Sequence, residues 1–219
     1  MKSVDVLLGL QWGDEGKGKV VDVLTPKYDV ITRFQGGPNA GHTLEFNGEK
    51  YVLRSIPSGI FQGGKINIIG NGVVLDPVLF QQEAYAFTCC PYFPIAFGCF
   101  VSSIEDTMSR QNEMCFFRNI KLAGKGIGPT YTDKVSRNGL RVGDLLHDFD
   151  AKYAKAKARH EAILQSLDYK YDMADLEAKW FASLDYLKQF RLIDSEHEIN
   201  RLLKEDKSVL AEGAQGTLL

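Results

Sequence analysis

The sequence predicts an α/β fold in which a mostly parallel central sheet is flanked by helices. Three observations lead to this prediction. Several short apolar runs have the length and composition of buried strands, segments with helical patterning separate or follow them, and four Gly-rich polar stretches interrupt the chain. Open parallel sheets bind their ligands at loops that follow the carboxyl ends of strands, so these stretches are the candidate site.

The first Gly-rich stretch, Gly13–Lys19, is the one around which the rest of the chain is organised. It follows an apolar run, Val4–Gly9, that predicts a buried strand, and it precedes Val20–Leu24, which predicts a helix ended by Thr25-Pro26. A strand, a Gly-rich turn and a helix N-terminus together point backbone N–H groups at an anion. The fold is therefore expected to be P-loop-NTPase-like.

The spacing within this stretch agrees only in part with a phosphate loop. Gly13, Gly18 and Lys19 match the pattern G-x-x-x-x-G-K, but Val20 stands where Ser or Thr would hold magnesium. Asp14 and Glu15 are also unusual, because a polyphosphate repels a carboxylate unless that carboxylate binds a metal or moves a proton. The alternative is a solvated, charged turn before a helix, which the density of glycine and lysine makes the less favoured interpretation.

A second strand is predicted at Tyr28–Phe34, followed by the second Gly-rich loop, Gln35–Thr43. His42 is the only histidine inside such a loop, and its neighbours would leave the ring beside an open polar site. The other three histidines are interpreted as surface residues; they are His147, His160 and His197.

The next part of the chain predicts a hairpin, a strand and a helix start. Leu44–Phe46 and Tyr51–Val52–Leu53 flank the turn signal Asn47-Gly48. Lys65–Gly70 predicts another buried strand, and Asp76-Pro77 is typical of an N-cap and first helical turn. From about Ala84 to Ile120 the pattern is atypical: aromatic residues are dense and neither helical nor strand periodicity emerges.

The atypical segment also contains all four cysteines, Cys89, Cys90, Cys99 and Cys115. Their spacing is not that of a zinc site, and a disulfide framework is not expected without export. An aromatic core segment is one interpretation. Our hypothesis is that these residues were translated out of frame or belong to a decayed segment, which the coding DNA would decide.

Regular patterning returns after residue 120. A third Gly-rich loop is predicted at Gly124–Tyr131, and the charged run Asp133–Asp144 could meet phosphate or be a solvated face. Helices are predicted over Asp150–Leu167, Asp172–Phe190 and from Ser195, with Glu198 in a capping box, to about Lys204. Ser208–Ala211 predicts a last strand that leads into the fourth loop, Glu212–Thr217.

Bulk properties exclude several classes of function. The 26 basic and 28 acidic residues give a net charge of −2, so no basic field argues for nucleic acid. No stretch approaches the roughly 20 apolar residues of a membrane helix, and no secretory signal is evident. We expect a cytoplasmic protein with one domain over residues 1–219, and the strand and loop at its end suggest a larger protein cut short.

Together the loops closely resemble the adenylosuccinate synthetase family. The motifs that carry the resemblance are long and in the same order: QWGDEGKGK (Gln11–Lys19), QGGPNAGHT (Gln35–Thr43), IPSGI (Ile56–Ile60), GNGVVLDP (Gly70–Pro77), GKGIGP (Gly124–Pro129), DKVSRNGLRVGD (Asp133–Asp144) and EGAQGTLL (Glu212–Leu219). The resemblance covers essentially all of the chain except residues 84–123. By this resemblance, the chain corresponds to about the first half of a family member.

The resemblance implies a ligase of AMP biosynthesis that joins inosine monophosphate (IMP) to L-aspartate with GTP and Mg²⁺. It implies Asp14 as the base that takes the proton from N1 of the purine, His42 as the acid that assists departure of GDP, and Lys17 as a further catalytic residue. We expect Asp14 and His42 to face each other across the cleft.

The binding residues are implied by the same resemblance, position by position. GTP would contact Gly13, Asp14, Glu15, Gly16, Lys17, Gly18, Lys19, Gly41, His42 and Thr43. IMP would be surrounded by Asp14, Glu15, Gly16, Lys17, Asn39, Ala40, Gly41, His42 and Gln215, with Arg137 supplied by the other subunit of a homodimer. Asp14 and the backbone of Gly41 would be the magnesium ligands.

Two departures from the family pattern bear on activity. Leu122-Ala123 stand where the family has two threonines, so the hydroxyl that contacts the IMP phosphate is absent. The family's guanine- and aspartate-binding residues lie beyond Leu219, which leads us to expect little or no turnover by this chain alone and some exposed apolar surface. The alternatives are a non-catalytic nucleotide-binding remnant of the enzyme and, ranked last, a different phosphate-loop enzyme such as a small-molecule kinase.

Overall fold

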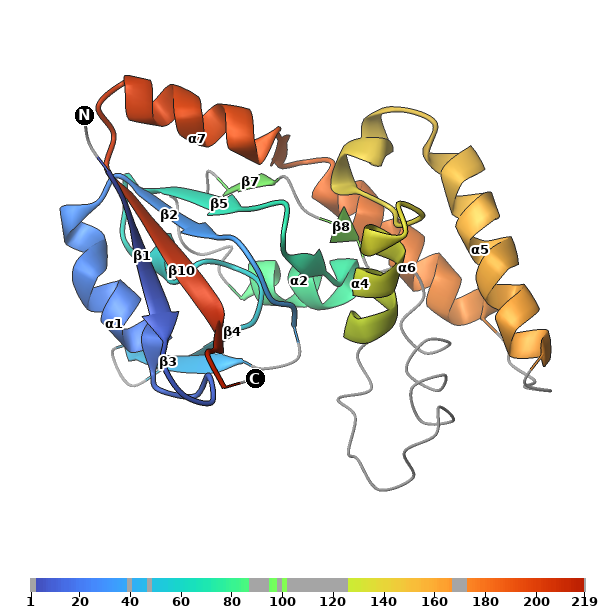
Figure 1. Cartoon of the computed structure of the whole chain (residues 1–219), viewed down its shortest axis with the longest axis horizontal. Helices are drawn as coiled ribbons and strands as arrows, with labels where there is room; N and C mark the ends of the chain where they lie inside the picture. The colour runs from blue at the N-terminus through green and yellow to red at the C-terminus, as the bar shows by residue number, and fades with distance from the viewer. Residues whose placement is uncertain are drawn as a thin grey trace.

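The central element is a six-stranded parallel sheet. A computed structural model describes residues 3–38, 41–46, 49–86, 95–97, 100–101, 126–166 and 173–218. The strands are paired in the order β1, β10, β2, β5, β7, β9 (Figure 1), and each adjacent pair is parallel. Their bounds are Val4–Gly9, Val209–Gly216, Val30–Arg33, Ile66–Ile69, Ile95–Phe97 and Arg191–Leu192. The predicted α/β fold with a mostly parallel sheet is therefore confirmed.

Helices α1 (Lys17–Leu24) and α7 (Ser195–Lys204) cover opposite faces of this sheet. Val30 and Val209, on neighbouring strands, pack with α7, whereas the next residues along those strands, Ile31 and Leu210, pack with α1. This alternation is the two-residue period of a strand, and both faces are apolar because both are covered.

Two small sheets flank the main one. β3 (His42–Phe46) and β4 (Glu49–Leu53) form the predicted antiparallel hairpin, whose turn residues 47–48 lie outside the described part. β6 (Val74–Leu75) pairs in parallel with β8 (Phe100–Val101). β7 and β8 fall within the segment of atypical composition, of which residues 87–94, 98–99 and 102–120, with all four cysteines, lie outside the described part.

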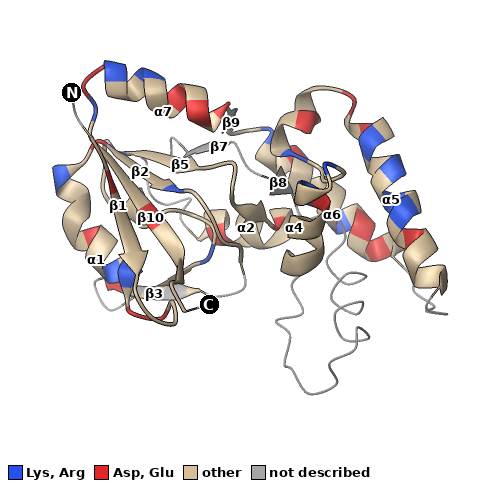
Figure 2. Cartoon of the chain, viewed as in Figure 1, with Lys and Arg blue, Asp and Glu red and all other residues tan. Residues whose placement is uncertain are grey.

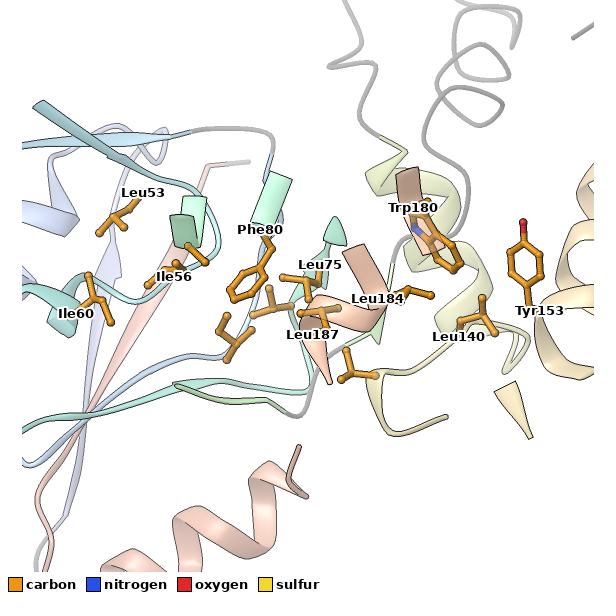
Figure 3. Close-up of a cluster of buried hydrophobic side chains, with 14 of the residues drawn as sticks. Leu53, Ile56, Ile60, Leu75, Phe80, Leu140, Tyr153, Trp180, Leu184 and Leu187 are labelled. Carbon is orange, nitrogen blue, oxygen red and sulfur yellow. The ribbon is translucent and has the colours of Figure 1, made fainter. Parts of the chain in front are cut away.

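A second core lies between α2 (Pro77–Tyr85), α5 (Phe149–Ser166) and α6 (Ala174–Leu187). Figure 3 shows its buried side chains, which run from Ile60 through Phe80 to Trp180 and Tyr153. Aromatic rings meet at ring-centroid distances of 5.4 Å for Phe80 and Phe190 and 5.3 Å for Tyr153 and Trp180. Such pairs add to the free energy of burial and join the helices to one another.

The helix ends agree with the sequence at α2 but not at α7. Asp76 caps α2, since its Oδ1 accepts the backbone N–H groups of Val78 (2.9 Å) and Leu79 (3.1 Å) ahead of Pro77. For α7 the predicted N-cap, Ser195, is wrong by one residue: Asp194 is the cap, and its Oδ1 accepts from the N–H of His197. An Asp immediately before a Ser offers two candidate caps, and local pattern alone does not separate them.

Other boundaries also differ from the prediction. α1 begins at Lys17 rather than Val20, and β10 continues to Gly216 where a loop was expected from Glu212. Part of the third predicted loop is helical, because α4 spans Ile127–Val135. Gly126, with a φ of 64°, forms the N-cap of α4, and its carbonyl accepts a bond from the Thr130 hydroxyl.

The interpretation of His160 as a surface residue is wrong. Its side chain is 3% exposed, on the face of α5 that packs against α4. Its Nε2 lies 2.8 Å from Oδ2 of Asp133, which Arg159 also contacts at 2.7 Å. His160 and Asp133 can be buried although both are polar, because their side chains pair with each other. His147 and His197 are exposed, as predicted.

One face of β1 leaves apolar side chains in contact with solvent, in agreement with the expectation of exposed apolar surface. Val4, Val6 and Leu8 are 39%, 53% and 53% exposed, and they point to the face that carries α7. β1 is also an edge strand, so one row of its backbone groups has no neighbouring strand in the described part of the chain. No helix within the described ranges is both long and apolar enough to cross a membrane.

The Asp76 cap gives a direct test of the fold. Replacing Asp76 with Ala removes the acceptor of two backbone N–H groups and should lower the free energy of unfolding by about 1 kcal/mol. Asn can accept the same bonds, so Asp76→Asn is the matched control and should lose clearly less. Urea unfolding followed by circular dichroism measures both; equal losses in the two variants would contradict this account.

Candidate functional site

A cleft of about 530 Å³ opens at the carboxyl ends of β1, β2 and β10. This is the edge of a parallel sheet at which ligands bind. Three of the Gly-rich stretches meet there although they are far apart in sequence. The described residues that line the cleft are Trp12, Gly13, Asp14, Gly16, Lys17, Gly18, Lys19, Arg33, Gly36, Gly37, Gly41, Thr43, Glu212, Gly213, Ala214 and Gln215.

The loop after β1 ends in a helix N-terminus that faces the cleft. Gly16 is the N-cap of α1 with a φ of 81°, a conformation that residues with a Cβ seldom adopt. No side chain caps the helix, so its first N–H groups remain available to an anion. Lys19 is exposed and Lys17 is buried beside it, and both line the cleft. This arrangement suits a phosphate group.

Glu15 and Lys17 are engaged with each other and with their own loop. The Lys17 ammonium donates to the carbonyl of Gly13 (2.9 Å) and to Oε2 of Glu15 (3.1 Å). The other carboxylate oxygen of Glu15 accepts the backbone N–H of Gln11 at 2.7 Å. Bonds from backbone N–H groups, first that of Glu15 itself, together with the Lys17 ammonium, lower the pKa of Glu15 from 4.5 to about 2. The Glu15 carboxylate thus shapes the loop and does not line the cleft.

The end of β10 is in direct backbone contact with this loop. Thr217 donates to the carbonyl of Gly9 from its N–H (3.1 Å) and from its hydroxyl (2.8 Å), and the N–H of Leu218 donates to the carbonyl of Gln11 (3.0 Å). A Cβ on Gly216 would lie 2.1 Å from the Gln11 carbonyl oxygen. Only glycine permits this approach, so the fourth Gly-rich stretch supports the first.

Two buried carboxylates hold the segment that follows β4. Glu83 accepts the N–H groups of Arg54 (2.9 Å), Ser55 (3.0 Å) and Ile56 (2.9 Å), and its burial raises its pKa. Glu212 accepts both the N–H (3.1 Å) and the hydroxyl (3.0 Å) of Ser58. The IPSGI motif is therefore a structural support that ties the helical part of the molecule to the wall of the cleft.

Arg33 and Glu212 are residues of the cleft wall that we did not single out from the sequence. They are register partners on β2 and β10, and they are 5% and 3% exposed. The Arg33 guanidinium donates to the Arg54 carbonyl. The sequence did hold a signal that could have identified them: each is a charged residue at the end of an otherwise apolar strand. Charges are seldom buried without a structural or functional partner.

The structure brings most of the predicted binding residues together. Gly13, Asp14, Gly16, Lys17, Gly18, Lys19, Gly41, Thr43 and Gln215 all line the cleft. Asn39 and Ala40 lie outside the described residues. The backbone of His42 opens β3 between two lining residues, but its side chain is not among those described, so its position opposite Asp14 stays a prediction.

Arg137 does not line the cleft. It is exposed in the turn after α4, with a φ of 61°. Asp133 fixes this turn: its carbonyl accepts the N–H groups of Asn138 (2.8 Å) and Gly139 (3.0 Å), while its carboxylate meets His160. The turn is thereby joined to α5, and Arg137 is presented at the surface.

The residues in the cleft fit a magnesium ion bound together with a phosphate. Asp14 is exposed in the cleft and offers carboxylate oxygens, and Gly41 offers a backbone carbonyl. Among the described residues there is no cluster of three or more His, Cys, Asp or Glu side chains. Mg²⁺ often takes only one or two protein ligands and completes its coordination with water and phosphate oxygens. Figure 2 shows acidic and basic residues side by side where the β1–α1 loop meets α1.

Comparison with known proteins identifies relatives over nearly the whole chain. The family model described as adenylosuccinate synthetase matches residues 6–219. Adenylosuccinate synthetases of Parabacteroides distasonis and Bacteroides thetaiotaomicron are 66% and 62% identical, over 99% of this chain and 53% of each relative. The chain thus spans about half the length of these curated relatives.

Solved structures agree with these matches. A fully ligated adenylosuccinate synthetase from Plasmodium falciparum superposes with a TM-score of 0.82 at 30% identity, covering 99% of this chain and 52% of the other. A cyanophage succinoaminodeoxyadenylate synthetase superposes with a TM-score of 0.63 at 18% identity, a likeness of fold alone.

The contact of Gly216 with the β1–α1 loop can be tested by substitution. Gly216→Ala places a methyl group against the Gln11 carbonyl, so the backbone must move and phosphate binding at the cleft should weaken roughly 10-fold or more, the effect of about 1.4 kcal/mol. Titration calorimetry with inorganic triphosphate measures this. Gly143→Ala, where an added Cβ meets nothing within 4 Å, is the control and should bind as the wild type does.

The low pKa of Glu15 predicts a specific pH dependence. Because folding lowers this pKa, Glu15 contributes stability that is complete above pH 4.5 and is lost as the pH falls from about 4.5 through about 2. The difference in urea midpoint between the wild type and Glu15→Gln should therefore be constant above pH 5 and shrink in acid. Glu45→Gln, on the exposed part of the hairpin, controls for general charge effects. A difference that did not change with pH would contradict the assignment.

Proposed function

The chain belongs to the adenylosuccinate synthetase family, and from that membership we propose that it forms the nucleotide-binding half of an enzyme that joins IMP to L-aspartate at the expense of GTP. The observation that carries the proposal is the cleft, where Asp14 stands among N–H donors and lysines at a helix N-terminus. A plain phosphate cradle does not need an exposed carboxylate, whereas proton transfer beside a phosphoryl group does.

We assign the proton transfers to two residues that act in successive steps, Asp14 as the base and His42 as the acid. Asp14 accepts the proton from N1 of IMP, which leaves negative charge on O6. O6 then bonds to the γ-phosphorus of GTP while the bond from that phosphorus to GDP breaks, and His42 donates a proton to the departing GDP. The amine of aspartate next attacks C6 and displaces the phosphate.

Other groups of the cleft would orient and stabilise the phosphates. The N–H groups at the start of α1, with Lys17 and Lys19, are suited to the charge that develops on the transferring phosphoryl group. The Lys17 ammonium has three donors, of which the Gly13 carbonyl and Glu15 accept two, so one donor remains for a phosphate oxygen. Asp14 and the Gly41 carbonyl would hold Mg²⁺, which when bound neutralises charge on the phosphates.

The remaining contacts of the proposed site extend over the cleft. GTP would contact residues 13–19 and 41–43, and IMP would contact residues 14–17, residues 39–42 and Gln215. Arg137 is exposed at the surface, which suits a residue that acts in the cleft of a second subunit; we therefore propose a homodimer. A cytoplasmic location is proposed from membership of the family. We propose neither a nucleic acid nor a membrane as a partner of this chain.

The 219-residue chain alone is proposed to bind nucleotide with little or no turnover. The chain spans 53% of its relatives' length, and Leu122-Ala123 lack the hydroxyl of the family pattern. In this state it would be a nucleotide-binding remnant or portion of the enzyme. Adding a polypeptide that corresponds to the second half of the P. distasonis relative should restore activity if the missing groups are the only deficiency.

Substitution of Asp14 tests the proposed function. Asp14→Asn keeps the size of the side chain but cannot accept the N1 proton, so turnover by the reconstituted halves should fall at least about 100-fold. The assay follows loss of IMP that depends on both GTP and aspartate. Asp185→Asn, on the exposed face of α6, is the matched control and should keep full activity.

Two results would overturn parts of the proposal. Turnover that persists in Asp14→Asn would remove Asp14 from the chemistry. Failure of the wild-type chain to bind GTP or IMP in calorimetry, with Mg²⁺ present, would remove the nucleotide-binding function itself.

A further inference from the structure

We propose that Tyr131 is a positioning residue whose hydroxyl holds the start of the second Gly-rich loop, at Gly36, in the position that lines the nucleotide cleft. This inference rests on the proposed function and adds a residue to it. Tyr131 lies in α4, half-buried, and is not among the described residues that line the cleft. Its hydroxyl nevertheless lies within hydrogen-bonding distance of three backbone groups on two other segments.

The geometry of these contacts assigns the direction of each hydrogen bond. The N–H of Gly36 donates to the Tyr131 oxygen at 3.1 Å. The hydroxyl has a single hydrogen to give, and two carbonyls are in reach, that of Gly72 at 3.0 Å and that of Gly36 at 3.3 Å. The Gly72 carbonyl is the nearer of the two, and the Gly36 carbonyl already accepts the N–H of Val74 at 2.8 Å, so we assign the hydroxyl hydrogen to Gly72. Tyr131 thereby joins the loop after β2 to the turn after β5.

Gly36 transmits this restraint to the cleft. It is buried, lines the cleft and has a φ of 97°. A Cβ on Gly36 would lie 2.4 Å from Cβ of Ala214, another lining residue at the end of β10. A Cβ on Gly37 would lie 2.5 Å from Cδ1 of Ile127 in α4. The start of the loop is thus wedged between β10 and α4, and the Tyr131 hydroxyl ties it to α4 by a hydrogen bond.

The helix that carries Tyr131 is itself well anchored. Asp133 meets His160 and Arg159 of α5, and the ammonium of Lys134 donates to the Asn71 carbonyl and lies 5.8 Å from the centre of the Tyr131 ring. The ring therefore has packing partners apart from its hydroxyl. Removal of the hydroxyl alone should leave the helix in place and take from the buried Gly36 N–H its acceptor at 3.1 Å, while the parallel bridge of Gly36 with Val73 remains.

The loop beyond Gly36 leads to Gly41 and Thr43, which line the cleft. If Tyr131 restrains the start of this loop, loss of its hydroxyl leaves a more mobile loop. That loop must be ordered when nucleotide binds, so the binding free energy becomes less favourable and the affinity falls. Substitution of Tyr131 should therefore raise the dissociation constants of IMP and of GTP with Mg²⁺. Substitution of a residue that merely stabilises α4 would leave these constants unchanged.

The test compares Tyr131→Phe with Tyr28→Phe in the full chain. Tyr28 also donates one hydroxyl hydrogen bond, to Asp5 at 2.7 Å, and is not among the residues that line the cleft. Amide hydrogen exchange by NMR and calorimetric titration with IMP and with GTP–Mg²⁺ are measured for both. We expect exchange at Gly36 to accelerate roughly 10-fold and nucleotide affinity to fall roughly 10-fold in Tyr131→Phe only, each corresponding to about 1.4 kcal/mol.

Each outcome decides a separate point. Unchanged exchange at Gly36 would overturn the hydrogen bond, and faster exchange with unchanged affinity would overturn the positioning role. If the wild type binds neither nucleotide, the proposed function fails, while exchange at Gly36 still decides whether Tyr131 restrains the loop. Should Tyr131→Phe unfold, 4-aminophenylalanine at this position keeps a donor to Gly72, and loss of Gly36 protection in that variant would support the proposal, whereas retained protection would overturn it.

Discussion

Parallel pairing of β1 with β10 is the constraint on which the rest of the structure depends. It places residues 4–9 beside residues 209–216, from opposite ends of the described chain. Because both strands run in the same direction, their carboxyl ends coincide, and the loop after β1 meets the end of β10. The backbone bonds from Thr217 and Leu218, and the contact at Gly216, then shape the loop in which Asp14 and Lys17 lie.

A second set of contacts fixes the parts of the cleft that lie farther from the β1–β10 pair. Glu83 and Glu212 hold the segment after β4 from two sides, and α4 stands against the loop after β2 through Tyr131. In both cases a polar group satisfies backbone N–H groups that a loop would otherwise bury unpaired. Glycines make up much of the cleft lining, and Glu83 and Tyr131 support it from outside the lining, whereas Glu212 is itself part of the cleft wall. This arrangement leaves the lining glycines free of bulk and keeps them fixed in place.

The exposed face of β1 adds an apolar strip to the edge of the main sheet. The relatives are nearly twice as long, and Val4, Val6 and Leu8 form an apolar strip at the edge of the main sheet. The same edge adjoins the cleft, since β1 leads directly into the loop that contains Asp14.

Sequence pattern alone was enough to predict the parallel α/β class, the hairpin and the Asp76 cap, and it also led to the proposal that the first loop binds phosphate. These follow from local periodicity, turn chemistry and the spacing of Gly13, Gly18 and Lys19 within one short stretch. Three other features became known from the folded chain alone: the burial of His160, the turn of Glu15 back to Lys17 and Gln11, and the shared position of Arg33 and Glu212 in the cleft wall. Those outcomes depend on partners between 2 and 179 positions away, and a local pattern carries no information on which distant carboxylate, strand or backbone group will satisfy a buried charge.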